Sequence, residues 1–278
     1  MTYCVYTDKE TLDPSPEHIL PLSLGGHDDF VIDVDREFNN DIGSKVDGKL
    51  ANDFIVLFDR DRAGAVGHSK KHPIPTVKNA KLTDGTPVQV KFGKDGLSIF
   101  DLREMKDIER SDSRTHQVQC NNIEIDIDID LMFVAKVALA AGYYAYGYDF
   151  VKNVRTDEFR KIMNLDKKNL PEDSLARVYP RFHEPEEGDD MFHILKMMTE
   201  IGNCSSVILA PSNENFGVAV SILGKFLGFI SVPCKSSNLV NDGNYKYGHC
   251  IYIQNEQVKR FSLDYIRLRL LNELEEKC

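Results

Sequence analysis

The stretch that decides the N-terminal fold reads Ser15-Pro16-Glu17-His18-Ile19-Leu20-Pro21-Leu22-Ser23-Leu24-Gly25-Gly26. An acid stands directly before a histidine, an apolar run with a proline follows, and a Gly-Gly turn closes the stretch. Further along, Asn39-Asn40 is followed by Gly43. A metal-assisted phosphodiester hydrolase needs oxygen ligands for a hard divalent cation and a neutral imidazole that takes a proton from water. Glu17 and Asn39 can supply the oxygens, and His18 can supply the base.

These residues carry a resemblance to a known family. Glu17-His18-Ile19-x-Pro21, then Gly25-Gly26, then Asn39-Asn40-x-x-Gly43 resemble the HNH endonucleases, whose fold is a small ββα-metal unit. The resemblance covers roughly residues 1–57. It implies that His18 is the general base and that Glu17 and Asn39 bind Mg²⁺ or Mn²⁺. Asn40 and His27 lie beside these residues in the sequence and are candidate accessory residues.

The sequence departs from the family at its zinc-binding cysteines and at one asparagine. Of the four positions where many members carry cysteine, only Cys4 is a cysteine, so we expect no structural zinc. Phe30 stands where the family carries the middle asparagine of its signature. We predict that Tyr3, Phe30 and Phe38 fill by apolar packing the space in which relatives hold the ion.

Charge is distributed unevenly along the chain, whose formal net charge is -10. Residues 1–60 hold 13 acidic and 5 basic side chains, whereas residues 62–94 hold 7 basic side chains and 1 acidic one. A basic surface next to an acidic catalytic unit attracts phosphate, which makes the following lysines candidate DNA contacts: Lys70, Lys71, Lys78 and Lys81. A solvated, lysine-rich linker and edge strand is the alternative.

The pattern along the chain predicts an α+β protein. We expect an HNH-like nuclease domain over 1–58, a linker over 59–77, and an α+β domain with an antiparallel meander over 78–278. The expected strands are 30–34, 88–92, 97–100, 117–130, 192–199, 206–210, 216–223, 226–232 and 250–253. The expected helices are 35–43, ending at Gly43, another after Ser44, then 131–148, 157–163 and 263–276.

The resemblance and the composition together predict a metal-dependent endonuclease that hydrolyses phosphodiester bonds in DNA. Restriction or phage defence, with protein partners of such a system, is the biological setting that the resemblance suggests. Two alternatives stay open: a catalytically inactive HNH-fold interaction subunit, and a nuclease that acts on RNA. The 6 cysteines form no C-x-x-C pair, and we see neither a secretory leader nor a membrane span, so we expect a cytoplasmic protein.

Overall fold

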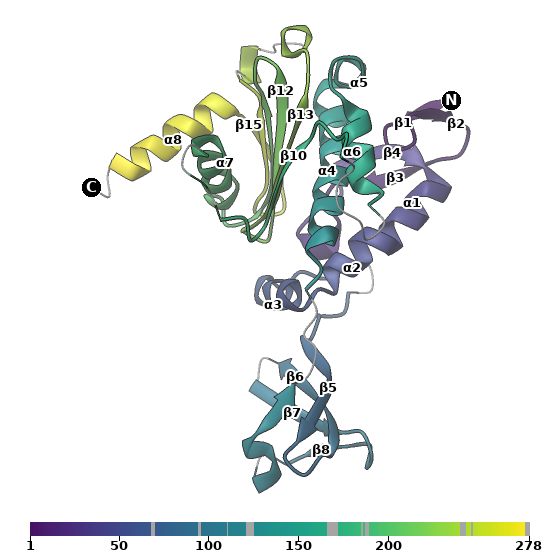
Figure 1. The fold of residues 1–278 in the computed structure, drawn as a ribbon, viewed down its shortest axis with the longest axis vertical. Helices are drawn as coiled ribbons and strands as arrows, with labels where there is room; N and C mark the ends of the chain where they lie inside the picture. Colours follow the sequence, from purple (N-terminus) through teal and green to yellow (C-terminus); the bar gives the residue numbers. More distant parts are fainter. Residues whose placement is uncertain are drawn as a thin grey trace. The chain divides into compact units, whose positions relative to one another are not determined.

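The computed structural model describes residues 1–67, 70–93, 96–109, 111–120, 125–165, 172–184, 186, 189–239, 243–245 and 247–275. They form two compact units, and the second interrupts the first in sequence (Figure 1). Unit 1 combines Met1–Leu50 with Ile127–Cys278, and unit 2 is Ala51–Asp126. These limits differ from the expected boundaries at 58 and 77. After unit 2, the chain from Ile127 onward belongs to the same unit as residues 1–50. Both units mix helices with antiparallel strands, so the α+β class is confirmed.

The N-terminal part of unit 1 is a strand hairpin followed directly by a helix. Its elements are β1 Thr2–Cys4, β2 Lys9–Thr11, β3 Pro14–His18, η1 Leu22–Leu24, β4 Val31–Asp35, α1 Arg36–Ile42, η2 Gly43–Asp47 and α2 Gly48–Ala51. The Asp35 side chain accepts a hydrogen bond from the Phe38 backbone N–H, so α1 begins where β4 ends. Helix α1 ends at Ile42 with Gly43 as its C-cap, as expected, but Gly43 has right-handed helical geometry, so the chain continues from it into the π-helical turn η2.

A six-stranded antiparallel sheet forms the rest of unit 1, in the order β10-β13-β12-β11-β14-β15. Its strands are β10 Arg177–Pro180, β11 Ser205–Pro211, β12 Asn215–Ile222, β13 Lys225–Pro233, β14 His249–Ile253 and β15 Val258–Ser262. The expected meander is confirmed as β11, β12 and β13. Helices α7 Asp190–Glu200 and α8 Leu263–Glu275 lie against one face of the sheet, and α4 Ile127–Tyr146 lies against the other (Figure 1). Two short 3-10 turns precede β14: η4 Ser236–Asn238 and η5 Gly243–Tyr245.

The segment expected as a strand over 192–199 is the helix α7 instead. Phe192, Leu195 and Met198 are buried against the sheet, and they recur at the helical spacing of three residues. The helix therefore buries one apolar stripe, which a strand with its alternating faces could not do with these positions.

Helix α4 is buried along most of its length, as its apolar composition predicts. It lies between the sheet and the N-terminal hairpins (Figure 1). It begins earlier than expected, because Asp128 and Asp130 belong to its first turn rather than to the strand expected over 117–130. Acidic side chains are favourable at a helix N-terminus. Asp130 is fully buried and accepts two hydrogen bonds from Arg181, at 2.7 and 3.0 Å.

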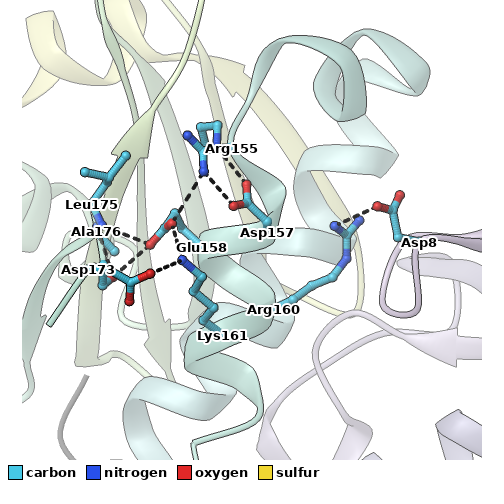
Figure 2. Close-up of polar contacts among 10 residues, drawn as sticks. Asp8, Arg155, Asp157, Glu158, Arg160, Lys161, Asp173, Leu175 and Ala176 are labelled. Atoms are coloured by element: carbon cyan, nitrogen blue, oxygen red, sulfur yellow. Dashed lines mark hydrogen bonds and ion pairs between the residues drawn. The ribbon is translucent and has the colours of Figure 1, made fainter. Parts of the chain in front are cut away.

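Two short helices, α5 Tyr148–Asn153 and α6 Thr156–Met163, follow α4. The buried carboxylate of Glu158 on α6 accepts hydrogen bonds from Lys161 Nζ at 2.9 Å, Ser174 Oγ at 2.8 Å and the Leu175 backbone N–H at 3.0 Å (Figure 2). Burial works to raise the pKa of Glu158, but these partners outweigh it and lower that pKa. The hydrogen bonds from Ser174 and Leu175 connect the segment that precedes β10 to helix α6.

The described residues of unit 2 form a five-stranded antiparallel sheet in the order β8-β7-β6-β5-β9, together with a helix and a 3-10 turn. Its elements are α3 Phe54–Ala63, β5 Thr76–Leu82, β6 Pro87–Gly93, β7 Gly96–Asp101, β8 Lys106–Ile108, η3 Ser113–His116 and β9 Val118–Cys120. The expected hairpin over 88–92 and 97–100 is confirmed as β6 and β7. Phe54 and Phe58 of α3 pack edge-on against Phe92, which joins the helix to the sheet. None of the helices among the described residues is long and apolar enough to cross a membrane.

Candidate functional site

The hairpin of β3 and β4 places Glu17 and His18 on opposite faces. Along β3, Ser15 and Glu17 are buried, Pro16 is exposed and His18 is partly exposed. Successive side chains of a strand point to opposite sides, so the two predicted site residues share a strand but not a face. The buried face meets α4, because Glu17 forms an ion pair with Lys136 of that helix, and Lys136 also contacts Asp47 of the turn η2.

His18 pairs with a carboxylate from the loop between the two strands. Its Nε2 lies 2.9 Å from Oδ1 of Asp28. The His18 side chain is 23% exposed and that of Asp28 is 80% exposed, so water reaches the pair. A carboxylate partner orients an imidazole ring and stabilises its protonated form. Sequence reasoning missed Asp28; the only signal for it is an acid shortly after the Gly-Gly turn.

Asn39 lies in the middle of α1 and faces β3. Its Nδ2 donates to Ser15 Oγ at 3.1 Å and to the Pro16 carbonyl oxygen at 3.3 Å. The contacts tie α1 to the strand that carries Glu17. Asn40 instead lines a surface pocket beside Asp35 and Asp41.

His27 contacts its own loop. Its Nδ1 accepts a hydrogen bond from the Asp29 backbone N–H at 3.1 Å. The structure therefore joins His18 to Asp28, Asn39 to Ser15 and His27 to the Asp29 backbone.

The Glu17 carboxylate belongs to a buried ionic cluster. The ammonium group of Lys136, in the middle of α4, forms an ion pair with Glu17 and lies 2.6 Å from Oδ2 of Asp47 in η2. The Lys136 side chain is 0% exposed, and Glu17 and Asp47 are also buried, with side chains 11% and 14% exposed. The hydroxyl of Tyr6 is buried next to them without a hydrogen-bond partner in the structure.

Burial and mutual charge set the pKa values in this cluster. Burial raises the pKa of Asp47 to about 6, against the lowering effect of the Lys136 ammonium. Burial works to lower the pKa of Lys136, but the carboxylates of Asp47 and Glu17 outweigh it and raise that pKa. Burial and the same two carboxylates raise the pKa of Tyr6 well above its usual range. Lys136 is therefore an ammonium at neutral pH, and the Tyr6 hydroxyl keeps its proton.

The donor set around Glu17 does not fit a divalent cation in this arrangement. The carboxylate already has a buried cation as its partner, and a second cation beside it would meet like charge. Among the described residues there is no group of three His, Cys, Asp or Glu side chains that could hold a metal ion. We therefore assign no chemical step to a metal held by Glu17 and Asn39.

Tyr3, Phe30 and Phe38, the side chains expected to replace a zinc site by apolar packing, each contact another aromatic ring near this hairpin. Phe30 is fully buried and meets Tyr144 edge-on, with ring centroids 5.1 Å apart. Phe38 packs against Tyr6 at 5.7 Å, and Tyr3 packs against Tyr143 at 5.6 Å. Apolar contacts therefore support the hairpin.

The four lysines proposed as DNA contacts are all in unit 2 and all exposed: Lys70, Lys71, Lys78 and Lys81. Lys78 and Lys81 lie on β5, and the other two precede it. Their exposure is compatible with either reading of the basic stretch. Comparison with known protein families, with curated proteins and with solved structures finds no match to this chain.

The raised pKa of Asp47 gives a test of the cluster. A carboxyl whose pKa is about 6 when folded, against about 3.9 when unfolded, binds more protons in the folded state between those values. Its contribution to stability is therefore complete below about pH 4 and is lost as the pH rises through 6. Carbon-detected NMR of labelled protein should show the Asp47 carboxyl titrating near pH 6. A midpoint at or below 4 would contradict the buried placement.

Proposed function

We propose that the N-terminal hairpin and α1 form the hydrolytic site of an endonuclease that acts on DNA, with His18 as its general base. The observation that carries the proposal is the pairing of a solvent-reachable His18 with Asp28, on a hairpin followed directly by a helix. That order of elements is also what the resemblance to HNH endonucleases implies.

The chemistry proposed for His18 is proton transfer from water. The neutral imidazole takes a proton as the water oxygen forms a bond to phosphorus, and the bond from phosphorus to the 3′-oxygen breaks. Asp28 then stabilises the imidazolium. A divalent cation, Mg²⁺ or Mn²⁺, is the cofactor that the resemblance implies, and it would supply charge stabilisation for the phosphate. The ion pair between Glu17 and Lys136 does not support Glu17 as a ligand of this cation.

A second candidate is favoured by a different observation. Glu17 is paired with Lys136, so it would not bind the metal ion that an HNH nuclease needs for catalysis. The chain could then have the fold of the nuclease without the activity. It would then be an inactive HNH-fold interaction subunit. A role in restriction or phage defence, and protein partners from such a system, follow for either candidate from the resemblance alone.

A cleavage assay separates the candidates. Purified full-length protein is incubated with supercoiled plasmid, and separately with single-stranded RNA, in Mg²⁺, in Mn²⁺ and in EDTA. An endonuclease acting on DNA converts the plasmid to nicked or linear forms at a rate proportional to enzyme concentration. Cleavage of RNA but not of the plasmid would show that the substrate is RNA and not DNA. A wild-type rate no higher than that of a mock purification in every condition would favour the interaction subunit.

The lysines of unit 2 can be tested by DNA binding. Replacing Lys70, Lys71, Lys78 and Lys81 together with glutamine should weaken binding to duplex DNA at low salt. Each lost phosphate contact should flatten the slope of log K against log salt by about 0.9. The matched control replaces two exposed lysines of unit 1, Lys9 and Lys225. An unchanged affinity and slope in the four-lysine variant would support the solvated-linker alternative.

A further inference from the structure

We infer that Lys136 is the resident cation of the N-terminal hairpin and helix: its ammonium group takes the place beside Glu17 that the resemblance gives to a divalent metal ion. The inference concerns binding and not turnover, so it stands independently of the proposed nuclease activity.

Three segments far apart in the sequence meet at this ammonium group. Glu17 comes from β3, Asp47 from the turn that continues α1, and Lys136 from the middle of α4. Asp47 and Lys136 are 89 positions apart. A structural metal ion joins chain segments by sharing ligands among them, and the ammonium group joins the hairpin, the first helix and α4 in the same way.

Burial makes this ammonium group a permanent part of the fold. Lysine is almost never fully buried unless it is paired, and here it has two carboxylate partners. Its side chain is enclosed by α4 neighbours and the hairpin, with the ring of Phe133 6.0 Å from Nζ. The group therefore cannot swing to solvent and leave its place to a metal ion without opening the contact between α4 and the hairpin.

The same contacts leave little for a hard cation to bind. Mg²⁺ requires near-octahedral oxygen ligands at roughly 2.0–2.1 Å, usually with carboxylates among them. Both carboxylates of the cluster are already paired with Lys136. The amide nitrogen of Asn39, the other predicted ligand, donates to Ser15 and Pro16, so its amide oxygen is the one atom of this side chain that could bind a cation.

Manganese binding and lysine NMR test the inference on the full-length protein. Metal-stripped wild type and Glu17→Gln are titrated with Mn²⁺, and free Mn²⁺ is followed by electron paramagnetic resonance. We expect the two titrations to coincide. One Mn²⁺ bound per wild-type chain and lost in Glu17→Gln would overturn the inference, whether or not either protein cleaves DNA.

The second measurement detects the ammonium group directly. In nitrogen-labelled wild type at neutral pH, we expect one lysine ammonium signal protected from exchange with water, shifted in Glu17→Gln. The surface variant Lys9→Gln is the control and should leave that signal unchanged. The absence of any protected ammonium signal from folded wild-type protein would show that Lys136 is not held as described.

Discussion

Lys136→Met is expected to lower the free energy of unfolding by about 3–5 kcal/mol, because it leaves two buried carboxylates without their counter-ion. Glu17 and Asp47 are both enclosed, so water cannot replace the lost ammonium group. Urea unfolding followed by circular dichroism measures the change. The variant should also become more stable towards acid pH relative to wild type, since protonating the carboxylates removes the unpaired charge.

Two further variants make this result specific. Tyr6→Phe changes the same cluster without touching the ion pairs. The Tyr6 hydroxyl has no hydrogen-bond partner among the described residues, so we expect little change in stability. Adding Glu17→Gln and Asp47→Asn to Lys136→Met removes the unpaired charges and should recover part of the loss. A Lys136→Met protein as stable as wild type would mean that the cluster is hydrated and contributes little.

His18→Ala is expected to reduce the rate of DNA cleavage by roughly 10²–10⁴-fold, the usual contribution of a general base. The folded state should change little, because His18 is partly exposed and exposed ion pairs typically contribute about 0–1 kcal/mol. Initial rates of plasmid nicking and the thermal midpoint are measured on the same preparations.

The neighbouring histidine supplies the matched control. The His27 ring contacts the backbone N–H and the carboxylate of Asp29 within its own loop, so His27→Ala should cleave at nearly the wild-type rate. Asp28→Asn keeps the shape of the partner but removes its charge, and it should lower the rate less than His18→Ala. Cleavage by His18→Ala at the wild-type rate would end the general-base assignment.

Local patterns in the sequence predicted the local structure well. The alternation that ends at Asp35, a residue able to cap a helix, indicated the strand and the helix that follow one another there. The apolar run around Phe133 indicated a buried helix, and the meander of β11 to β13 followed from short apolar runs and turns. Helix α7 was missed because apolar residues are so dense over this short segment that the sequence alone does not show which of them are buried.

Long-range partners could not be predicted in the same way. Nothing near Glu17 in the sequence indicates that its carboxylate is paired with Lys136, because the pairing depends on how α4 packs against the hairpin. One signal was present: Lys136 is the only charged residue of α4 after its first turn, and a charged residue in such an apolar run must find a partner when buried. The insertion of unit 2 was not predicted, because the change from acidic to basic sequence near residue 60 indicated a boundary but not that the chain returns to unit 1 at Ile127.

The insertion of unit 2 within unit 1 has a consequence for synthesis on the ribosome. The carboxylates of Glu17 and Asp47 are made long before the lysine that neutralises them, since 89 positions separate Asp47 from Lys136. At about 5–20 residues per second, roughly 4–18 s pass between the addition of Asp47 and the addition of Lys136. During that delay the nascent hairpin carries negative charge without its counter-ion, and its apolar face is not yet covered by α4. We therefore expect a chain truncated before α4 to fold poorly and to bind chaperones.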